Sequence, residues 1–150
     1  MPSCKNELRS NKKNLDKVFV YGTLMKGFWN HRRHLDGRIS RVTPGKVKGL
    51  LYHLPEGYPA LLEGSETVKG EIVEPVDEEL LEALDRLEGY REGRRNNLYI
   101  RSLGNVLTED REEITCWVYF YADGEYARGN GIPVPNGDWR EFMKNGRELI

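Results

Sequence analysis

Short apolar runs alternate with polar segments that contain glycine, asparagine or proline along most of the chain. The first run, Val18 to Val20, has the length of a strand, and Tyr21-Gly22-Thr23-Leu24 follows it directly. Pro44-Gly45 indicates a turn inside the next apolar segment. Further strands are predicted over four stretches with alternating or continuous apolar residues: Arg38–Leu54, Thr67–Glu74, Leu98–Val106 and Ile114–Tyr121.

The last of these predicted strands is apolar on both faces. Cys116 and Val118 point to one side, and Trp117 and Tyr119 point to the other. A strand of this kind is typical of the middle of a sheet or barrel. Because turns separate most of the strands, we expect a largely antiparallel sheet. One long helix and two short ones accompany the strands. Asn30 is a candidate cap for a short helix through Leu35, and the other short helix begins at about Trp139. The pattern therefore predicts an α+β fold with a curved sheet or small β-barrel.

The segment from Pro75 to Glu88 carries the strongest helix signal in the chain. Asp77 is a candidate N-cap, and Gly89 is placed to end the helix. At about 100° per residue the leucines of this segment gather on one face, which predicts a buried stripe of Leu80, Leu81, Leu84 and Leu87. Glu88 falls on that same face, whereas the other acidic residues avoid it.

A carboxylate among leucines in the last turn of a helix is electrostatically unfavourable. Burial and the negative end of the helix dipole both raise the pKa of such a group. A carboxyl group with a raised pKa suits general acid–base catalysis near neutral pH, which makes Glu88 a candidate catalytic residue. Two structural alternatives stay open at this point: the last turn frays and releases Glu88 to water, or an arginine pairs with it.

The turn after the first strand is a second candidate site. A strand that runs out into a glycine turn leaves several backbone N–H groups unpaired, and such groups form a concavity that suits a carboxylate or a phosphate. Gly22 also allows backbone angles that other residues avoid. The alternative is a plain strand-to-loop turn with no ligand.

Length and charge describe an ordinary single domain. The 150 residues carry a formal net charge of −1, which argues against a surface that binds nucleic acid. Residues 1–15 are polar and lack periodicity, so we expect a flexible extension over residues 1–15 and one domain over residues 16–150. There is no signal peptide pattern and no apolar run long enough to cross a membrane. Cys4 and Cys116 lie in unlike contexts, so we expect no disulfide and a cytoplasmic location.

The sequence gives no signal for a metal or an organic cofactor. His31 and His34 are three residues apart and His53 is distant, without a supporting cluster of carboxylates or cysteines. Nucleotide-binding glycine motifs and nucleophile motifs of the serine or cysteine type are also absent from the sequence. We therefore expect no cofactor.

Two motifs together resemble the signatures of the γ-glutamylcyclotransferase-like superfamily: Val20-Tyr21-Gly22-Thr23-Leu24 and Leu84-Asp85-Arg86-Leu87-Glu88-Gly89-Tyr90. Three further segments resemble the AIG2-like branch that includes γ-glutamylamine cyclotransferase: Met25-Lys26-Gly27 before Asn30-His31, Gly57-Tyr58-Pro59-Ala60-Leu61, and Gly137-Asp138-Trp139. The resemblance covers about Val18 to Arg140. It implies a small, mostly antiparallel β-barrel with flanking helices.

The resemblance also implies an activity. In this family the α-amine of a γ-glutamyl group attacks its own γ-carbonyl and releases 5-oxoproline and an amine or amino acid, without a cofactor. By resemblance, the residues that bind the substrate are Tyr21, Gly22, Thr23 and Leu24, and Glu88 transfers the protons. Tyr99 and Tyr119 are weaker candidates for the pocket wall. The arginine-rich loop from Tyr90 to Asn97 is longer than the common pattern, and we expect it to rim the pocket.

Two other functions fit the same residues. A binding module could keep the pocket for small carboxylates without turnover. An amide hydrolase could use Glu88 to activate water, which would yield free glutamate in place of 5-oxoproline.

Overall fold

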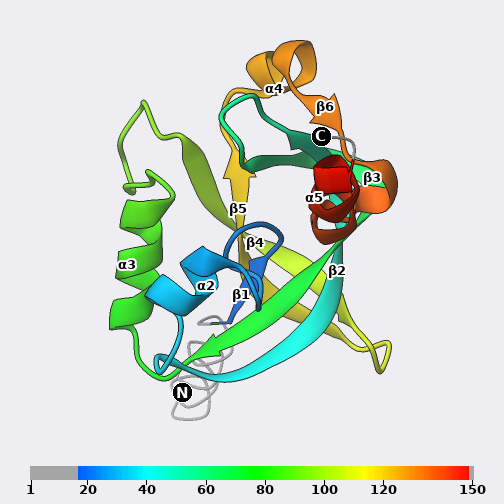
Figure 1. Ribbon diagram of the computed structural model, residues 1–150. Helices are drawn as coiled ribbons and strands as arrows, with labels where there is room; N and C mark the ends of the chain where they lie inside the picture. The colour runs from blue at the N-terminus through cyan, green and yellow to red at the C-terminus, as the bar shows by residue number, and fades with distance from the viewer. Residues whose placement is uncertain (1–16, 149–150) are drawn as a thin grey trace.

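The structure, a computed structural model, describes residues 17–148. Five strands form a closed barrel, in which neighbours follow the order β3, β1, β5, β4, β2 and a pairing between β2 and β3 closes the ring (Figure 1). These strands are β1 (Val18–Val20), β2 (Ile39–His53), β3 (Pro59–Pro75), β4 (Tyr99–Thr108) and β5 (Glu113–Tyr121). A short strand, β6 (Ile132–Pro133), pairs with the end of β2.

The barrel is antiparallel except between β1 and β5, which run parallel. This confirms the predicted α+β fold with a small, mostly antiparallel β-barrel. The apolar strand β5 lies between β1 and β4, as its two-sided pattern predicted. In the parallel pair Phe19 lies opposite Val118, so the chain after β1 leaves the barrel beside Tyr119.

Strands β2 and β3 form one long hairpin, and the turn predicted at Pro44-Gly45 is wrong. Both residues lie inside β2, where they pair with Glu71 and Gly70. A Cβ on Gly45 would lie 2.8 Å from Cγ1 of Val106, so this glycine permits the close approach of two barrel walls. A register shift between Gly49 and Leu50, which pair with Glu66 and Leu62, interrupts the ladder of this hairpin.

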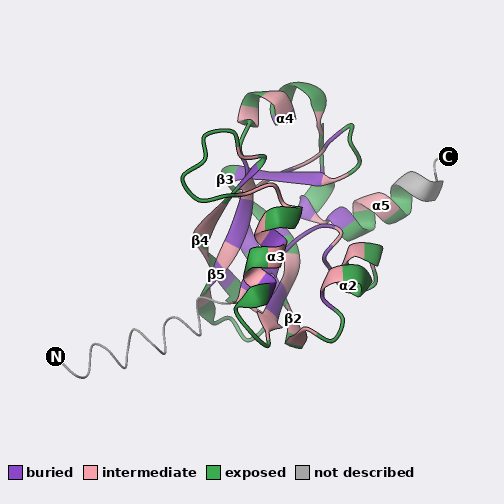
Figure 2. Cartoon of the chain, turned by 90° about the vertical axis from the view of Figure 1, so that its left-hand side faces the viewer, coloured by how far each residue is buried: buried purple, intermediate pink, exposed green. Residues whose placement is uncertain are grey.

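Helix α3 (Glu79–Leu87) covers one side of the barrel, with its outer face exposed in Figure 2. Glu78 occupies the N-cap position, but Asp77 supplies the predicted capping hydrogen bond, because its carboxylate accepts the backbone N–H of Leu80 at 3.2 Å. Gly89 ends it with a φ of 66°. The N–H of Gly89 donates to Arg86 at 3.3 Å and that of Tyr90 donates to Asp85 at 2.8 Å, which are the two bonds of a Schellman motif.

The predicted buried stripe of α3 is correct for two of its four leucines. Leu80 and Leu84 are fully buried and Leu81 is partly buried, but Leu87 is 38% exposed. Leu87 lies at the end of the helix, where the barrel no longer covers it and a cavity begins.

The remaining helices connect or flank the strands. They are α2 (Trp29–His34), α4 (Gly124–Asn130), the 3₁₀ turn η1 (Pro135–Gly137) and α5 (Trp139–Glu148). The expected helices after Asn30 and from Trp139 are present, whereas α4 was not predicted. Trp139 is buried and donates its indole N–H to Nδ1 of His53 at 3.1 Å, so it anchors α5. Within residues 17–148 no helix is long and apolar enough to span a bilayer. The predicted extension lies outside the described residues.

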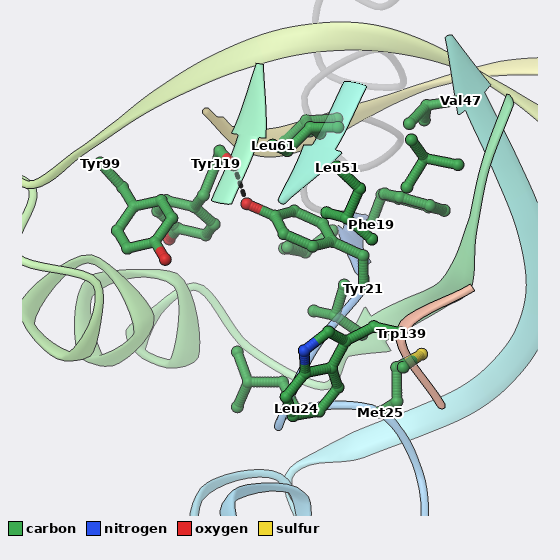
Figure 3. Packing of buried hydrophobic residues seen from close by; sticks show 14 of the residues in the cluster. Phe19, Tyr21, Leu24, Met25, Val47, Leu51, Leu61, Tyr99, Tyr119 and Trp139 are labelled. Atoms are coloured by element: carbon green, nitrogen blue, oxygen red, sulfur yellow. Dashed lines mark hydrogen bonds between the residues drawn. The ribbon is translucent and has the colours of Figure 1, made fainter. Parts of the chain in front are cut away.

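The barrel interior forms the core. Phe19, Leu51 and Leu61 pack together there, and the hydroxyl of Tyr21 donates to the backbone carbonyl of Tyr119 (Figure 3). This hydrogen bond ties the chain after β1 to β5 at the point where the candidate site begins.

Candidate active site

A cavity of about 200 Å³ lies where the chain after β1 meets the end of α3 and the adjoining ends of β3, β4 and β5. It brings together residues that are far apart in the sequence. All of the predicted site residues line it: Tyr21, Gly22, Thr23, Leu24, Glu88, Tyr99 and Tyr119. The two family motifs therefore open onto one shared space rather than onto opposite sides of the molecule.

The turn after β1 is held from behind by α2. The N–H of His31 donates to the carbonyl of Thr23 at 3.2 Å, and its Nδ1 lies 2.8 Å from the carbonyl of Leu24. Because a carbonyl oxygen only accepts, Nδ1 carries the hydrogen. In a trans peptide the N–H points opposite to the carbonyl, so the N–H of Leu24 points away from α2.

The same turn leaves main-chain donors without partners. Within residues 17–148, the N–H groups of Gly22, Thr23 and Leu24 donate to no protein acceptor, while the N–H of Met25 closes the turn on Gly22 at 3.0 Å. We name these three N–H groups the amide cradle. Adjacent unpaired amides at a cavity wall are suited to a carboxylate or phosphate oxygen.

Gly22 is required by space rather than by backbone angle, which corrects the sequence interpretation. Its φ is not positive. A Cβ at this position would lie 2.7 Å from Cγ of Pro59 and 2.9 Å from its Cδ. Glycine therefore allows the turn to pack against the first residue of β3, and any side chain would push the amide cradle away from that wall.

Glu88 is the C-cap residue of α3, and its side chain is partly buried against the cavity. Burial raises the pKa of its carboxyl group from 4.5 to about 7. Among residues 17–148 no ion pair involves Glu88, so the pairing with an arginine that the sequence left open is not present there. The group can accept or release a proton at neutral pH.

Three of the four lining tyrosines donate their hydroxyl hydrogens to acceptors within the protein. Tyr21 donates to the carbonyl of Tyr119, Tyr99 donates to the carbonyl of Pro59 at 2.6 Å, and Tyr119 donates to Oδ1 of Asp85 at 2.7 Å. Burial is the main cause that raises the pKa of each hydroxyl above its usual range. These phenols are therefore neutral wall residues, and their oxygens can accept a hydrogen bond from a ligand but not donate one.

Seven further lining residues were not among the predicted site residues: Phe19, Val20, Asn30, Tyr58, Pro59, Leu87 and Leu98. Asn30 was interpreted as a helix cap, but Phe28 occupies that position and the Asn30 amide donates to Oγ1 of Thr23 at 2.8 Å. The segment around Tyr58 and Pro59 was a usable signal, because it was already part of the family resemblance.

The arginine-rich loop does not line the cavity with its own side chains. Arg94 donates to Asn97 at 3.0 Å and to the carbonyl of Gly89 at 2.9 Å. That carbonyl also accepts the N–H of Leu98 at 3.0 Å. These contacts hold the lining residue Leu98 next to Gly89 at the end of α3. The expected rim is therefore not formed by the loop itself, and the exposed lining residues beside it are Leu87 and Leu98. Within residues 17–148, no group of three His, Cys, Asp or Glu side chains is arranged to hold a metal ion.

Comparisons with known proteins agree with this geometry. The family model described as gamma-glutamyl cyclotransferase, AIG2-like, matches residues 18–141. The chain is 32% identical over 130 residues to the gamma-L-glutamyl-butirosin B gamma-glutamyl cyclotransferase of Niallia circulans, which covers 85% of this chain and 78% of that protein. It is 34% identical over 119 residues to the gamma-glutamylaminecyclotransferase of Bos taurus, covering 70% of this chain and 65% of the bovine protein.

A solved structure supports the same assignment. The crystal structure of an AIG2-like protein from Mus musculus superimposes with a TM-score of 0.60 at 30% identity, covering 74% of this chain and 81% of the mouse chain. The family model covers both motifs and nearly all of the described barrel. This chain therefore belongs to the AIG2-like gamma-glutamyl cyclotransferase family and is an enzyme of that class.

Proposed function

We propose that this enzyme cyclises the γ-glutamyl group of a γ-glutamyl amine, and that Glu88 is its general acid–base catalyst. The observation that carries the proposal is the shared cavity, which is lined by a carboxyl group with a pKa of about 7 and by the amide cradle. The cradle would hold the α-carboxylate of the glutamyl group. Glu88 would then act on the α-amine and on the leaving nitrogen.

The reaction balances without water or a co-reactant. The α-nitrogen attacks the γ-carbonyl carbon, a new C–N bond closes the five-membered lactam, and the bond from that carbon to the leaving nitrogen breaks. The α-ammonium gives up two protons and keeps one as the lactam N–H. The leaving nitrogen gains two protons and departs as an ammonium. Glu88 as the ionised carboxylate takes a proton from the α-nitrogen, and as the protonated acid it delivers one to the leaving nitrogen.

Most of the catalytic work in such a reaction is positional. The nucleophile and the electrophile already belong to one molecule, and holding them at attack distance is worth ~7 kcal/mol or more of the barrier. A positioned base adds about 10²–10⁴-fold in rate. The cavity of about 200 Å³ has room for the equivalent of about seven water molecules, which matches a folded glutamyl group rather than a whole conjugate. The leaving group would therefore extend past Leu87 and Leu98.

The charges around the cavity favour an amine over an α-amino acid as the leaving group. Within residues 17–148 the lining contains no lysine, arginine or histidine, and its one carboxyl group is that of Glu88. A carboxylate next to the scissile nitrogen would lie near Glu88 with no cation to pair with it, which is costly. The names of the bovine and Niallia relatives, for a γ-glutamylamine and for γ-glutamyl-butirosin B, support the same class.

Two matched substrates test the proposal: γ-glutamylethylamine and γ-glutamylalanine, which differ by one carboxylate on the carbon next to the scissile nitrogen. We expect 5-oxoproline and ethylamine from the first, and much slower release from the second. Glu88→Gln should abolish turnover, while Glu82→Gln, an exposed position on the same helix, should keep it. Release of free glutamate would indicate a hydrolase, and calorimetric binding of 5-oxoproline without turnover would indicate a binding module.

A further inference from the structure

We infer that Arg101 is a positioning residue that keeps Glu88 in place, because it contacts the chain on both sides of Glu88. We call these contacts the tie. The inference rests on the proposed function for its effect on catalysis, but the tie itself can be measured without turnover. Arg101 lies on β4 and does not line the cavity, so it acts through other residues rather than on the substrate.

The first contact is with Asp85, one helical turn before Glu88. Nη1 of Arg101 lies 3.2 Å from Oδ2 of Asp85, and the side chains of the two residues are 15% and 18% exposed. The other carboxylate oxygen, Oδ1, accepts the hydroxyl of Tyr119 on β5 at 2.7 Å. Asp85 is therefore held by two neighbouring strands, because Arg101 lies opposite Tyr119 in the β4–β5 ladder.

The second contact is with Tyr90, two residues after Glu88. The guanidinium carbon of Arg101 lies 5.6 Å from the centre of the Tyr90 ring and 4.4 Å from the centre of the Trp117 ring. The N–H of Tyr90 also closes back on the carbonyl of Asp85 at 2.8 Å. One guanidinium thus contacts the residue three positions before Glu88 and the residue two positions after it.

The chemistry of the Arg101–Asp85 ion pair suits it to fixing the position of Asp85 rather than to stabilising the fold. A largely buried ion pair is seldom more stabilising than apolar residues of the same volume, because both charges lose their hydration. In addition, Nε of Arg101 is buried and has no acceptor within residues 17–148. A guanidinium is planar and can pair with a carboxylate at its edge while it stacks on aromatic rings with its face. A lysine has the charge but not that shape.

The tie fixes the position of the Glu88 side chain, but it does not set the pKa of the Glu88 carboxyl group. Burial is the cause of the raised pKa of Glu88, whereas the Arg101 charge acts on Asp85 and lowers a pKa that burial raises. Loss of Arg101 should therefore leave the pH midpoint of activity near 7 while it lowers the rate.

The test compares Arg101→Ala and Arg101→Lys with Arg41→Ala, which removes an arginine from a surface ion pair with Glu74 on the same barrel. All rates are measured where unfolding curves show every variant to be folded. We expect kcat of Arg101→Ala to fall about 10–100-fold, as for a misplaced catalytic group, with KM little changed. Arg101→Lys should be intermediate, and Arg41→Ala should match the unmodified enzyme. Guanidinium ion, below denaturing concentrations and against a KCl control, should partly restore Arg101→Ala.

Amide hydrogen exchange separates this inference from the proposed function. In Arg101→Ala, the N–H groups of Glu88, Gly89 and Tyr90 should exchange faster, while those of β2 and β3 stay protected. Unchanged exchange at these three amides overturns the inference whatever the activity. So does an unchanged kcat, or a KM that rises in step with the loss of kcat. If the unmodified enzyme makes no 5-oxoproline, the proposed function fails, and the exchange result alone supports or overturns the tie.

Discussion

Replacing Glu88 with glutamine should make the protein more stable at high pH, although it should abolish activity. Glutamine has the shape of glutamate and carries no charge at any pH. The folded structure holds the Glu88 carboxyl where burial raises its pKa from 4.5 to about 7. The C-terminal end of α3 adds a further unfavourable interaction with the ionised form. The ionised glutamate is therefore a destabilising feature of the native state.

The size and sign of the effect follow from proton binding. Below pH 4.5 the carboxyl is protonated in both folded and unfolded chains, so it costs nothing. Between pH 4.5 and about 7 the unfolded chain loses the proton first, and the free energy of unfolding falls as pH rises. Above that range the decrease in the free energy of unfolding is complete. Each pH unit between the two pKa values contributes ~1.4 kcal/mol, so the full decrease is about 3 kcal/mol. Because the side chain borders a cavity and is only partly buried, we expect about 1–3 kcal/mol.

Urea or thermal unfolding at several pH values measures the difference. At about pH 4 the glutamine variant and the unmodified protein should be equally stable, and at about pH 8 the variant should be stabler by about 1–3 kcal/mol. That corresponds to a rise in Tm of about 2–4 °C for each kcal/mol in a domain of this size. Glu82→Gln, on the exposed face of the same helix, should stay within about 0.5 kcal/mol at every pH.

Two results would refute this reasoning. A Glu88→Gln variant that is no stabler than the unmodified protein at high pH would mean that the carboxylate is not desolvated. A stability difference that is the same at all pH values would mean that packing rather than charge is responsible. Either result would also remove the physical basis for a base that titrates near neutrality.

Three further predictions concern the same cavity. The kcat/KM for 5-oxoproline release should fall tenfold per pH unit on the acid side of a midpoint near 7, where Glu88 becomes protonated, and a midpoint near 4.5 would indicate an exposed carboxyl. Gly22→Ala should raise KM and lower stability by about 1–3 kcal/mol, because its methyl group would lie 2.7 Å from Pro59, and steady-state kinetics with urea unfolding would show both. His31→Leu should raise KM strongly because the carbonyl of Leu24 loses its donor, whereas His31→Asn, which retains an N–H donor, should raise it less; equal KM values would contradict the role of this hydrogen bond.

The sequence was most informative where one element determines the outcome. The helical period placed Glu88 on the apolar face of α3, where it borders the cavity, and capping chemistry identified Asp77 and Gly89 near the helix ends. The same reasoning failed where a second element intervenes. Pro44-Gly45 has the composition of a turn, yet Gly45 lies within a strand because Val106 and Ile72 approach its backbone. Leu87 follows the apolar period but lies beyond the edge of the barrel, which no periodicity reports.

The same distinction between features set by one element and features set by a second element applies to the candidate site. A motif indicated which residues form the turn after β1, but not which way its amides point. That direction depends on hydrogen bonds from Asn30 and His31, whose positions along the chain are those of an ordinary short helix. Likewise, nothing in the sequence of β4 distinguishes Arg101. Its role becomes visible only when the β4–β5 register places it opposite Tyr119 and within ion-pair distance of Asp85. The groups that bind or react with the substrate can be found from the local sequence pattern, whereas the groups that orient them are defined by contacts between elements. Substitutions of the orienting residues should therefore change rates and affinities while leaving both motifs intact.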